Sequence, residues 1–97
     1  MAEYLLLMHD DTTTPEAEER WPAYLEGLAA RGALRGGSAI GGGVTLRLAG
    51  TAAPTSGLTG FVRVEAPDLD GARALVAGNP TFEAGGTIEV RELPRTD

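Results

Sequence analysis

The stretch Glu3-Tyr4-Leu5-Leu6-Leu7-Met8-His9 decides the fold of this 97-residue chain. Apolar side chains occupy both alternating positions of the stretch, and successive side chains of a strand point to opposite faces of a sheet. Both faces of this strand therefore have to be covered, which is typical of a strand in the middle of a sheet. We predict a central first strand from Glu3 to His9, with the later elements arranged around it.

A helix is predicted after this strand. Thr14 and Pro15 are typical of an N-cap followed by proline at the first helical position. Pro22 complicates a regular helix, because a proline at that depth removes a helical hydrogen bond. We expect either a kink at Pro22 or an irregular segment from Pro15 to Arg20 with the main helix beginning near Trp21. The apolar stripe and the C-terminal stop consist of Trp21, Leu25, Leu28, Ala29 and Gly32.

The rest of the chain supplies four more strands and a second helix. The strands are predicted over Ala33 to Ile40, Val44 to Ala49, Leu58 to Ala66 and Thr87 to Leu93, and the helix from Pro67-Asp68 to Ala77. The order β-α-β-β-β-α-β is that of an α+β fold, a ferredoxin-like split βαβ with one added strand. Both helices are expected on one face of a mainly antiparallel sheet, within a single domain over residues 1–97.

The sheet face opposite the helices is predicted to mix apolar and charged side chains. Its expected members are Leu5 and Leu7 or their alternates, Thr45, Arg47, Phe61, Arg63, Glu65, Glu89 and Arg91. An open face of this kind usually meets a copy of itself, and a chain this short has little apolar area to spare. We therefore expect a homodimer with its sheets packed face to face.

The composition excludes several classes of partner. A net charge of −6 at pH 7 argues against a nucleic acid or an anionic membrane, since both require clustered basic charge. The chain has no cysteine, which fits a reducing cytoplasm, and all eight basic residues are arginines. The only N-terminal apolar run, Tyr4 to Met8, is far shorter than a signal sequence or a membrane span. One histidine and scattered acids predict no metal site.

Three segments carry a resemblance to a known family. They are Tyr24 to Gly32, the pair Gly36-Gly37, and Gly78-Asn79-Pro80-Thr81-Phe82-Glu83-Ala84-Gly85-Gly86-Thr87-Ile88-Glu89-Val90-Arg91-Glu92-Leu93. Together with the Tyr4 to Met8 run, the Trp21 helix and Asp68-Leu69-Asp70, they resemble the YCII-related family almost end to end. The resemblance implies a small dimeric α+β protein with a barrel-like dimer, and a few members of that family are lyases or dehydrochlorinases with a His-Asp pair.

The chain departs from this family in two places. Trp21-Pro22-Ala23-Tyr24-Leu25 resembles the helix on which dyad-bearing members place their histidine, and Tyr24 stands at the matching position. An Asp-Gly-Pro-Phe segment found in one branch is replaced by Thr51-Ala52-Ala53-Pro54-Thr55-Ser56-Gly57-Leu58. The family's His-Asp mechanism and any role of that loop are therefore not carried over.

The candidate catalytic residues are His9, Asp10 and Tyr24. His9 is the only histidine, it ends the central strand, and a neighbouring carboxylate such as Asp10 can orient it as a general base. Tyr24 can donate a hydrogen bond but is a poor base at pH 7. The alternatives are a polar residue that ends a strand and a tyrosine that packs its ring on a helix face.

The candidate ligand-binding residues are Arg47, Arg63, Arg91 and Ser38. The three arginines share a strand parity and can converge on an anionic group, or they can form cross-strand ion pairs with Glu65 and Glu89 instead. Ser38 lies among glycines that leave room for a ligand against bare backbone. No helix follows these glycines as a phosphate loop requires, and no histidine near Ser38 in the sequence makes it a nucleophile.

The sequence predicts a protein that binds a small organic molecule. Proton-transfer chemistry such as isomerisation, cyclisation or elimination needs only a pocket, one base and one hydrogen-bond donor, so no cofactor is expected. The alternative is a non-catalytic dimeric module that senses a ligand or serves a regulatory or biosynthetic system.

Overall fold

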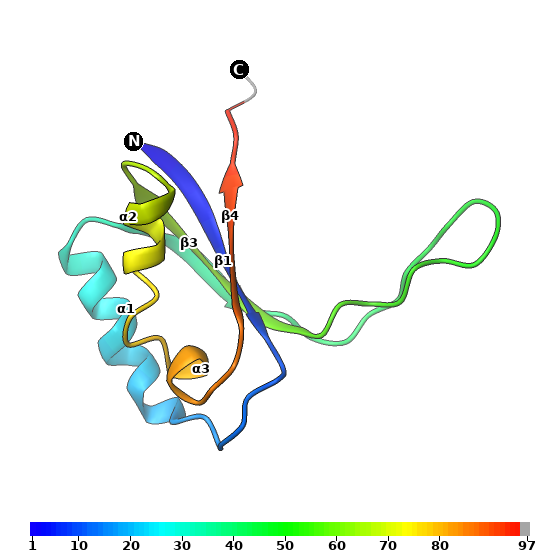
Figure 1. The fold of residues 1–97 in the computed structure, drawn as a ribbon, viewed down its shortest axis with the longest axis horizontal. Coiled ribbons are helices and arrows are strands. Elements are labelled where there is room, and N and C mark those ends of the chain that lie inside the picture. The colour runs from blue at the N-terminus through cyan, green and yellow to red at the C-terminus, as the bar shows by residue number, and fades with distance from the viewer. Residues whose placement is uncertain (96–97) are drawn as a thin grey trace.

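The first strand lies inside the sheet, as its sequence predicts. In the computed structural model, which describes residues 1–95, β1 (Ala2–His9) pairs antiparallel with β3 (Leu58–Ala66) and with β4 (Ile88–Leu93). β2 (Leu34–Ala39) pairs antiparallel with β3, so the strand order is β2-β3-β1-β4. The helices pack on one face of this sheet (Figure 1). The predicted α+β, ferredoxin-like fold is confirmed.

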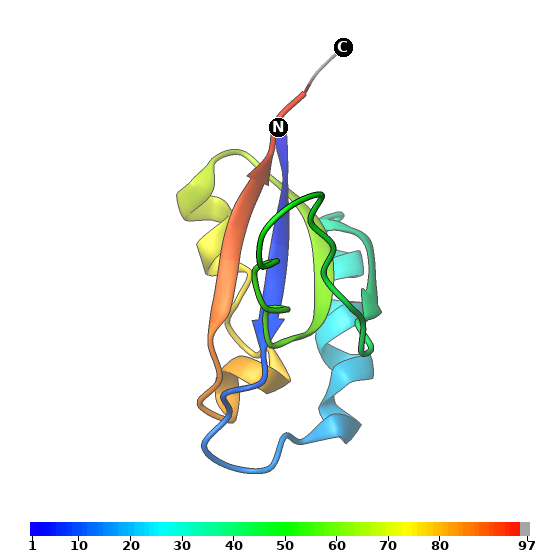
Figure 2. The same cartoon turned by 90° about the vertical axis from the view of Figure 1, so that its right-hand side faces the viewer.

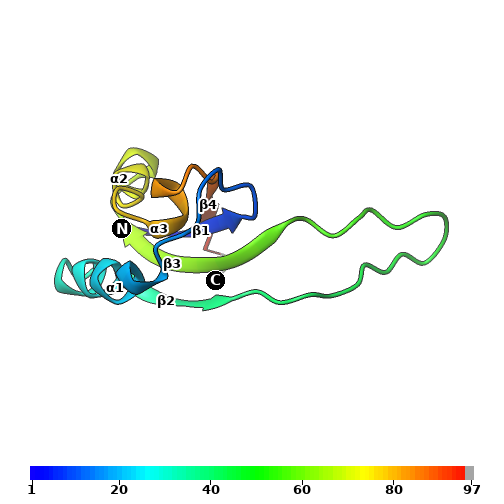
Figure 3. The same cartoon turned by 90° about the horizontal axis from the view of Figure 1, so that it is seen from below.

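The added strand predicted over Val44 to Ala49 does not form. Residues 41–57 instead make an extended arm that projects away from the sheet and the helices (Figures 1 and 3). Val44, Leu46 and Leu48 alternate as a strand requires, but they are 82%, 91% and 104% exposed. A strand needs a hydrogen-bonding neighbour and a surface for its apolar side, and within one chain this segment has neither.

The first long helix begins one residue before Pro22. A 3-10 turn, η1 (Glu18–Arg20), precedes α1 (Trp21–Ala30), which confirms an irregular segment before a helix that begins at Trp21. Pro22 falls in the first turn of α1, where its missing amide hydrogen breaks no helical bond. The helix ends at Ala30, and Gly32, two residues later, has a φ of +72° that favours glycine. Thr14 caps no helix and donates its amide and hydroxyl to the Ala84 carbonyl oxygen.

Two short helices complete the covered side of the sheet. α2 (Leu69–Ala74) begins after Asp68, whose Oδ1 accepts the Gly71 amide at 2.8 Å, and it ends three residues before the predicted Ala77. α3 (Pro80–Glu83) begins after Asn79, whose side chain accepts the amides of Thr81 and Phe82. Both starts follow the general preference for Asp and Asn at the N-cap.

The core lies between these helices and one face of the sheet. Tyr4, Leu6 and Met8 of β1 point toward the helices and are buried, and so are Val62 and Val64 of β3. The opposite face, here called the open face, carries the other parity of the strands. Its residues are Glu3, Leu5, Leu7 and His9 of β1, Phe61, Arg63 and Glu65 of β3, and Glu89 and Arg91 of β4. Within residues 1–95 no helix has the length and apolar character to cross a membrane.

The burial of β1 predicts which substitution weakens the fold most. Leu6 is fully buried in the central strand, so Leu6→Ala should lower the free energy of unfolding by about 2 to 5 kcal/mol. Leu69→Ala is the control, because Leu69 is half exposed at the start of α2 and should cost less than about 1 kcal/mol. Urea denaturation followed by circular dichroism measures both. Equal losses for the two variants would contradict the central position of β1.

Candidate functional site

A cavity of about 500 Å³ lies between α1 and the β2–β3 side of the sheet. Most of its wall is apolar, with the indole of Trp21 and the side chain of Leu25 on one side and β-strand residues on the other. We call it the α1 pocket. Its lining residues are Met8, Glu16, Glu18, Trp21, Leu25, Leu34, Gly36, Gly37, Ser38, Ala39, Thr59, Gly60, Phe61, Val62 and Thr81.

Glycines keep the α1 pocket open. A side-chain carbon added at Gly36 would meet no atom within 4 Å, and the φ of +146° at this position disfavours any other residue. Gly37 brings β2 against β3 so closely that an added carbon would lie 2.7 Å from the Phe61 carbonyl oxygen. The glycine-rich strand β2 therefore approaches its neighbour tightly while contributing almost no side-chain volume to the space beneath α1.

A carboxylate is fixed in the wall of this pocket. The Glu16 side chain accepts a hydrogen bond from Trp21 Nε1 at 3.0 Å and a second, short one from Thr81 Oγ1. These bonds tie the segment before α1 to α3. Glu18 is the other charged lining residue, and no arginine within residues 1–95 lines the pocket. The pocket is thus apolar with an acidic edge, and sequence reasoning missed Glu16 because its partners are set by tertiary packing.

Tyr24 lies behind the pocket, in the core. Its hydroxyl donates to the Leu75 carbonyl oxygen at 2.7 Å, and its ring meets Trp21 edge to face with the centroids 5.7 Å apart. Burial raises the pKa of Tyr24 above its ordinary 10.0, so the phenol is neutral at pH 7. Tyr24 therefore packs against Trp21 and bonds to the main chain, and its hydroxyl does not reach the lining of the pocket.

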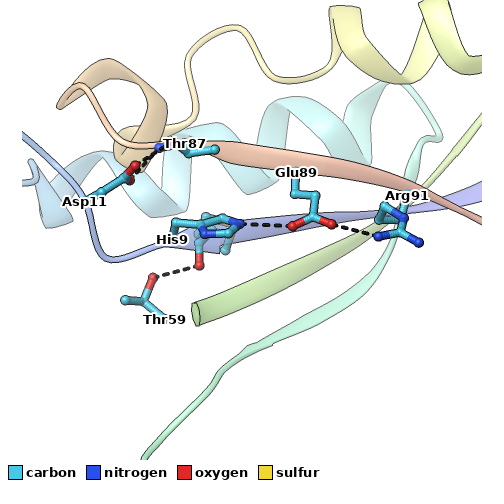
Figure 4. A network of polar contacts seen from close by, with 7 residues as sticks. His9, Asp11, Thr59, Thr87, Glu89 and Arg91 are labelled. Carbon is cyan, nitrogen blue, oxygen red and sulfur yellow. Dashed lines mark hydrogen bonds and ion pairs between the residues drawn. The ribbon is translucent and has the colours of Figure 1, made fainter. Parts of the chain in front are cut away.

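His9 lies on the other side of the sheet, on the open face. Its Nε2 is 3.1 Å from Glu89 Oε1, and Glu89 Oε2 accepts a hydrogen bond from Arg91 at 2.8 Å (Figure 4). The hydrogen bond from Arg91, and then that from His9, lowers the pKa of Glu89 below its ordinary 4.5. Glu89 is therefore ionised at neutral pH, and it holds the imidazole in one orientation.

Asp10 follows His9 but turns away from it. Its amide donates to the Gly57 carbonyl oxygen at 2.8 Å, and its carboxylate lies against Gly57 at the base of the arm. No hydrogen bond joins His9 to Asp10 in the described part of the chain. The structure thus supplies Glu89, from β4, as the carboxylate beside His9. Within one chain it does not bring Tyr24, on the helix side of the sheet, to His9.

The four candidate ligand-binding residues are dispersed. Ser38 lines the α1 pocket, and its hydroxyl bonds to the Ala39 carbonyl oxygen. Arg47 lies on the arm and donates to the Thr51 carbonyl oxygen. Arg63 and Arg91 flank Leu5 on the open face, where each is paired with a glutamate of its own: Arg63 with Glu3 at 3.0 Å and Arg91 with Glu89. Within one chain the three arginines do not converge on one point.

A second acidic side chain fastens the loop after β1. The Asp11 carboxylate accepts the Thr87 amide at 2.8 Å and the Thr87 hydroxyl at 2.6 Å, so it anchors this loop to the segment just before β4 (Figure 4). These bonds, that from the hydroxyl first, lower the pKa of Asp11 below its ordinary 3.8. Among residues 1–95, no three His, Asp or Glu side chains are grouped to hold a metal ion.

The comparison with known proteins gives a match over nearly the full chain. The model of the YCII-related domain matches residues 2–96, a span that includes every helix and strand described above. No curated protein matches the chain. The matched span therefore includes the α1 pocket and the His9–Glu89 pair. No activity is assigned to the chain from a curated relative.

The Asp11–Thr87 contact predicts a pH dependence. Because the folded pKa of Asp11 is lowered, its contribution to stability is present above the unfolded pKa and is lost as the pH falls through the folded pKa. In a carbon-detected NMR titration Asp11 should titrate below 3.8, and Thr87→Val should raise its pKa toward that value. Thr45→Val, on the exposed arm, is the control and should leave the titration unchanged. A normal Asp11 pKa in the unmodified protein would show that the contact does not persist in solution.

Proposed function

We propose that this chain, which belongs to the YCII-related domain family, binds a small and largely apolar organic molecule in the α1 pocket. The observation that carries this proposal is the pocket itself. Its volume of about 500 Å³ lies within the roughly 300 to 1,000 Å³ typical of small-molecule sites. An apolar wall with a small number of fixed polar groups is also typical of such sites.

The charge of the residues that line the α1 pocket favours a neutral or cationic ligand. Both charged lining residues, Glu16 and Glu18, are carboxylates, and the whole chain carries a net charge of −6. An anionic ligand would meet like charge without a basic group to offset it, whereas an amine or a hydroxyl can donate to Glu16. Each carboxylate oxygen of Glu16 accepts one bond from the protein and retains a second lone pair for a ligand. The supported ligand is therefore neutral or cationic, with a donor attached to an apolar body.

Trp21 allows a direct test, because it is the only tryptophan and lies in the pocket wall. Titration with cyclohexylmethylamine, cyclohexylmethanol and cyclohexanecarboxylate should change the tryptophan emission. The amine should bind at least about 10-fold more tightly than the carboxylate, a difference of about 1.4 kcal/mol. Glu16→Gln should remove most of this preference.

Glu19→Gln is the matched control, since Glu19 is exposed and does not line the pocket. It should leave the order of the three affinities as in the unmodified protein. If none of the three compounds changes the emission or the melting temperature, the pocket is not a site for this class of molecule. Equal binding of the amine and the carboxylate would contradict only the proposed charge of the ligand, and the pocket would remain a site for small molecules.

The His9–Glu89 pair favours a second function, cofactor-free proton transfer. An ionised carboxylate that bonds one ring nitrogen of an imidazole orients the ring and stabilises its protonated form. The other nitrogen, Nδ1, has no hydrogen-bond partner among residues 1–95, so it is available to a reactant. Arg63 and Arg91 lie on the same face and can donate to a developing oxyanion. These roles suit isomerisation, cyclisation or elimination.

Proton exchange tests this second function without knowledge of the natural substrate. The α protons of cyclohexanone in D2O, followed by proton NMR, should exchange faster with the protein than in buffer. His9→Ala should lower the added rate by about 100-fold or more, the usual scale for loss of a general base. Glu89→Gln should lower it as well, whereas an effect of Asp10→Asn alone would assign the orienting role to Asp10. Ligand binding with no added exchange would favour a non-catalytic sensing or accessory module.

A further inference from the structure

Thr81 lines the α1 pocket, yet it is only 1% exposed and is held on several sides. Its amide donates to Asn79 Oδ1 at 2.9 Å, and its carbonyl oxygen accepts the Gly86 amide at 2.9 Å. Its methyl group lies against Gly86, where an added side-chain carbon would be 2.8 Å away. Because the methyl group is fixed, the hydroxyl on the same carbon is fixed as well.

This hydroxyl holds the only carboxylate that is fixed in the pocket wall among the described residues. The segment between β1 and η1 lies beside α3, at the end of the domain where β1 ends (Figures 1 and 2). Thr14 fastens this segment by donating its amide and hydroxyl to the Ala84 carbonyl oxygen. The Thr81 hydroxyl donates to Glu16 Oε1, and Trp21 Nε1 donates to Glu16 Oε2 at 3.0 Å. The carboxylate is therefore held at both oxygens, by groups from two different elements.

The side-chain donors of the pocket are already engaged. Within residues 1–95, the lining side chains that carry a donor are those of Trp21, Ser38, Thr59 and Thr81. Trp21 and Thr81 donate to Glu16, whereas the hydroxyls of Ser38 and Thr59 donate to main-chain carbonyl oxygens at 2.9 Å and 3.5 Å. The lone pairs left on these hydroxyls and on the carboxylate can only accept. The polar side chains that are fixed in the wall therefore present acceptors to a ligand.

We propose that the α1 pocket selects ligands that donate a hydrogen bond over ligands that only accept one, and that Thr81 is the positioning residue for this selectivity. The inference rests on the small-molecule site proposed above, and it applies among neutral ligands, where charge plays no part. Because Thr81 holds Glu16 before a ligand arrives, an alcohol or amine does not have to order that side chain on binding. An ether or ketone would remove water from the carboxylate and return no hydrogen bond to it.

Cyclohexylmethanol and its methyl ether test the selectivity, because both are neutral, share one apolar body and differ in the O–H donor. Tryptophan emission should show that the alcohol binds at least about 10-fold more tightly than the ether. Thr81→Val, which keeps the branched shape and removes the hydroxyl, should reduce this ratio to below about 3-fold. Thr81→Ser, which keeps the hydroxyl, should retain the ratio. Thr14→Val is the matched control, since it removes a hydroxyl from the same junction that does not bond to Glu16.

The indole N–H provides a second measurement that needs no ligand. Trp21 is the only tryptophan, so a nitrogen-15 NMR spectrum contains one indole signal, and this N–H bonds to Glu16. Thr81→Val should shift that signal because it releases the carboxylate, whereas Thr14→Val should leave it in place. Glu16→Gln does not alter the buried threonine, and its new amide donor should make the ether bind more tightly than it binds to the unmodified protein.

The outcomes separate this inference from the proposed site. If the amine binds but the alcohol and the ether bind equally, the selectivity is overturned and the small-molecule site stands. If none of the compounds binds, both are overturned. A full alcohol preference in Thr81→Val, its loss in Thr81→Ser, or an equal loss in Thr14→Val would show that Thr81 does not position Glu16. Melting temperatures from circular dichroism establish that each variant is folded, and Glu16→Gln decides the selectivity if Thr81→Val is not.

Discussion

The structure depends on one constraint, which is that β1 carries apolar side chains on both of its faces. The helices satisfy this constraint on one side, where Leu6 and its neighbours of the same parity are buried. Leu5 and Leu7 remain partly exposed on the other side, beside ion pairs that hold the strand surface together. This division separates two kinds of chemistry. The covered side contains an apolar pocket with a fixed carboxylate, and the open side contains the imidazole and its glutamate.

The sequence predicted the parts of the fold that depend on local rules. Proline geometry placed the beginning of α1 at Trp21, and a glycine of positive φ ended it. The added strand was wrong, because alternation from Val44 to Leu48 indicates a periodic apolar side but not the neighbour that a strand needs. The N-cap at Thr14 was wrong for a similar reason, since that hydroxyl bonds to Ala84, which lies 70 residues away along the chain. Long-range pairing decided both outcomes.

The candidate site was predictable only in part, for the same physical reason. His9 stands out because it is the only histidine of the chain, and histidine is the most frequent general base of proton-transfer sites. Glu89 beside it could not be assigned from the sequence, because the contact depends on the antiparallel register of β1 with β4. The α1 pocket arises from the distance between a helix and a glycine-rich strand, and the role of Glu16 depends on Thr81 in a third element. In the sequence, only the glycines of β2 indicated that room for a ligand exists beside this strand.

The separation of the arm from the core has an evolutionary consequence. Substitutions at Leu6 or Val64 are constrained by folding, because these side chains are fully buried. Residues 41–57 contribute no side chain to the core, so changes there leave the free energy of unfolding of the domain almost untouched. Selection can therefore reshape the length and sequence of this segment independently of the fold. Paralogous chains with the same domain can diverge in which molecules they recognise while the sheet and helices stay the same.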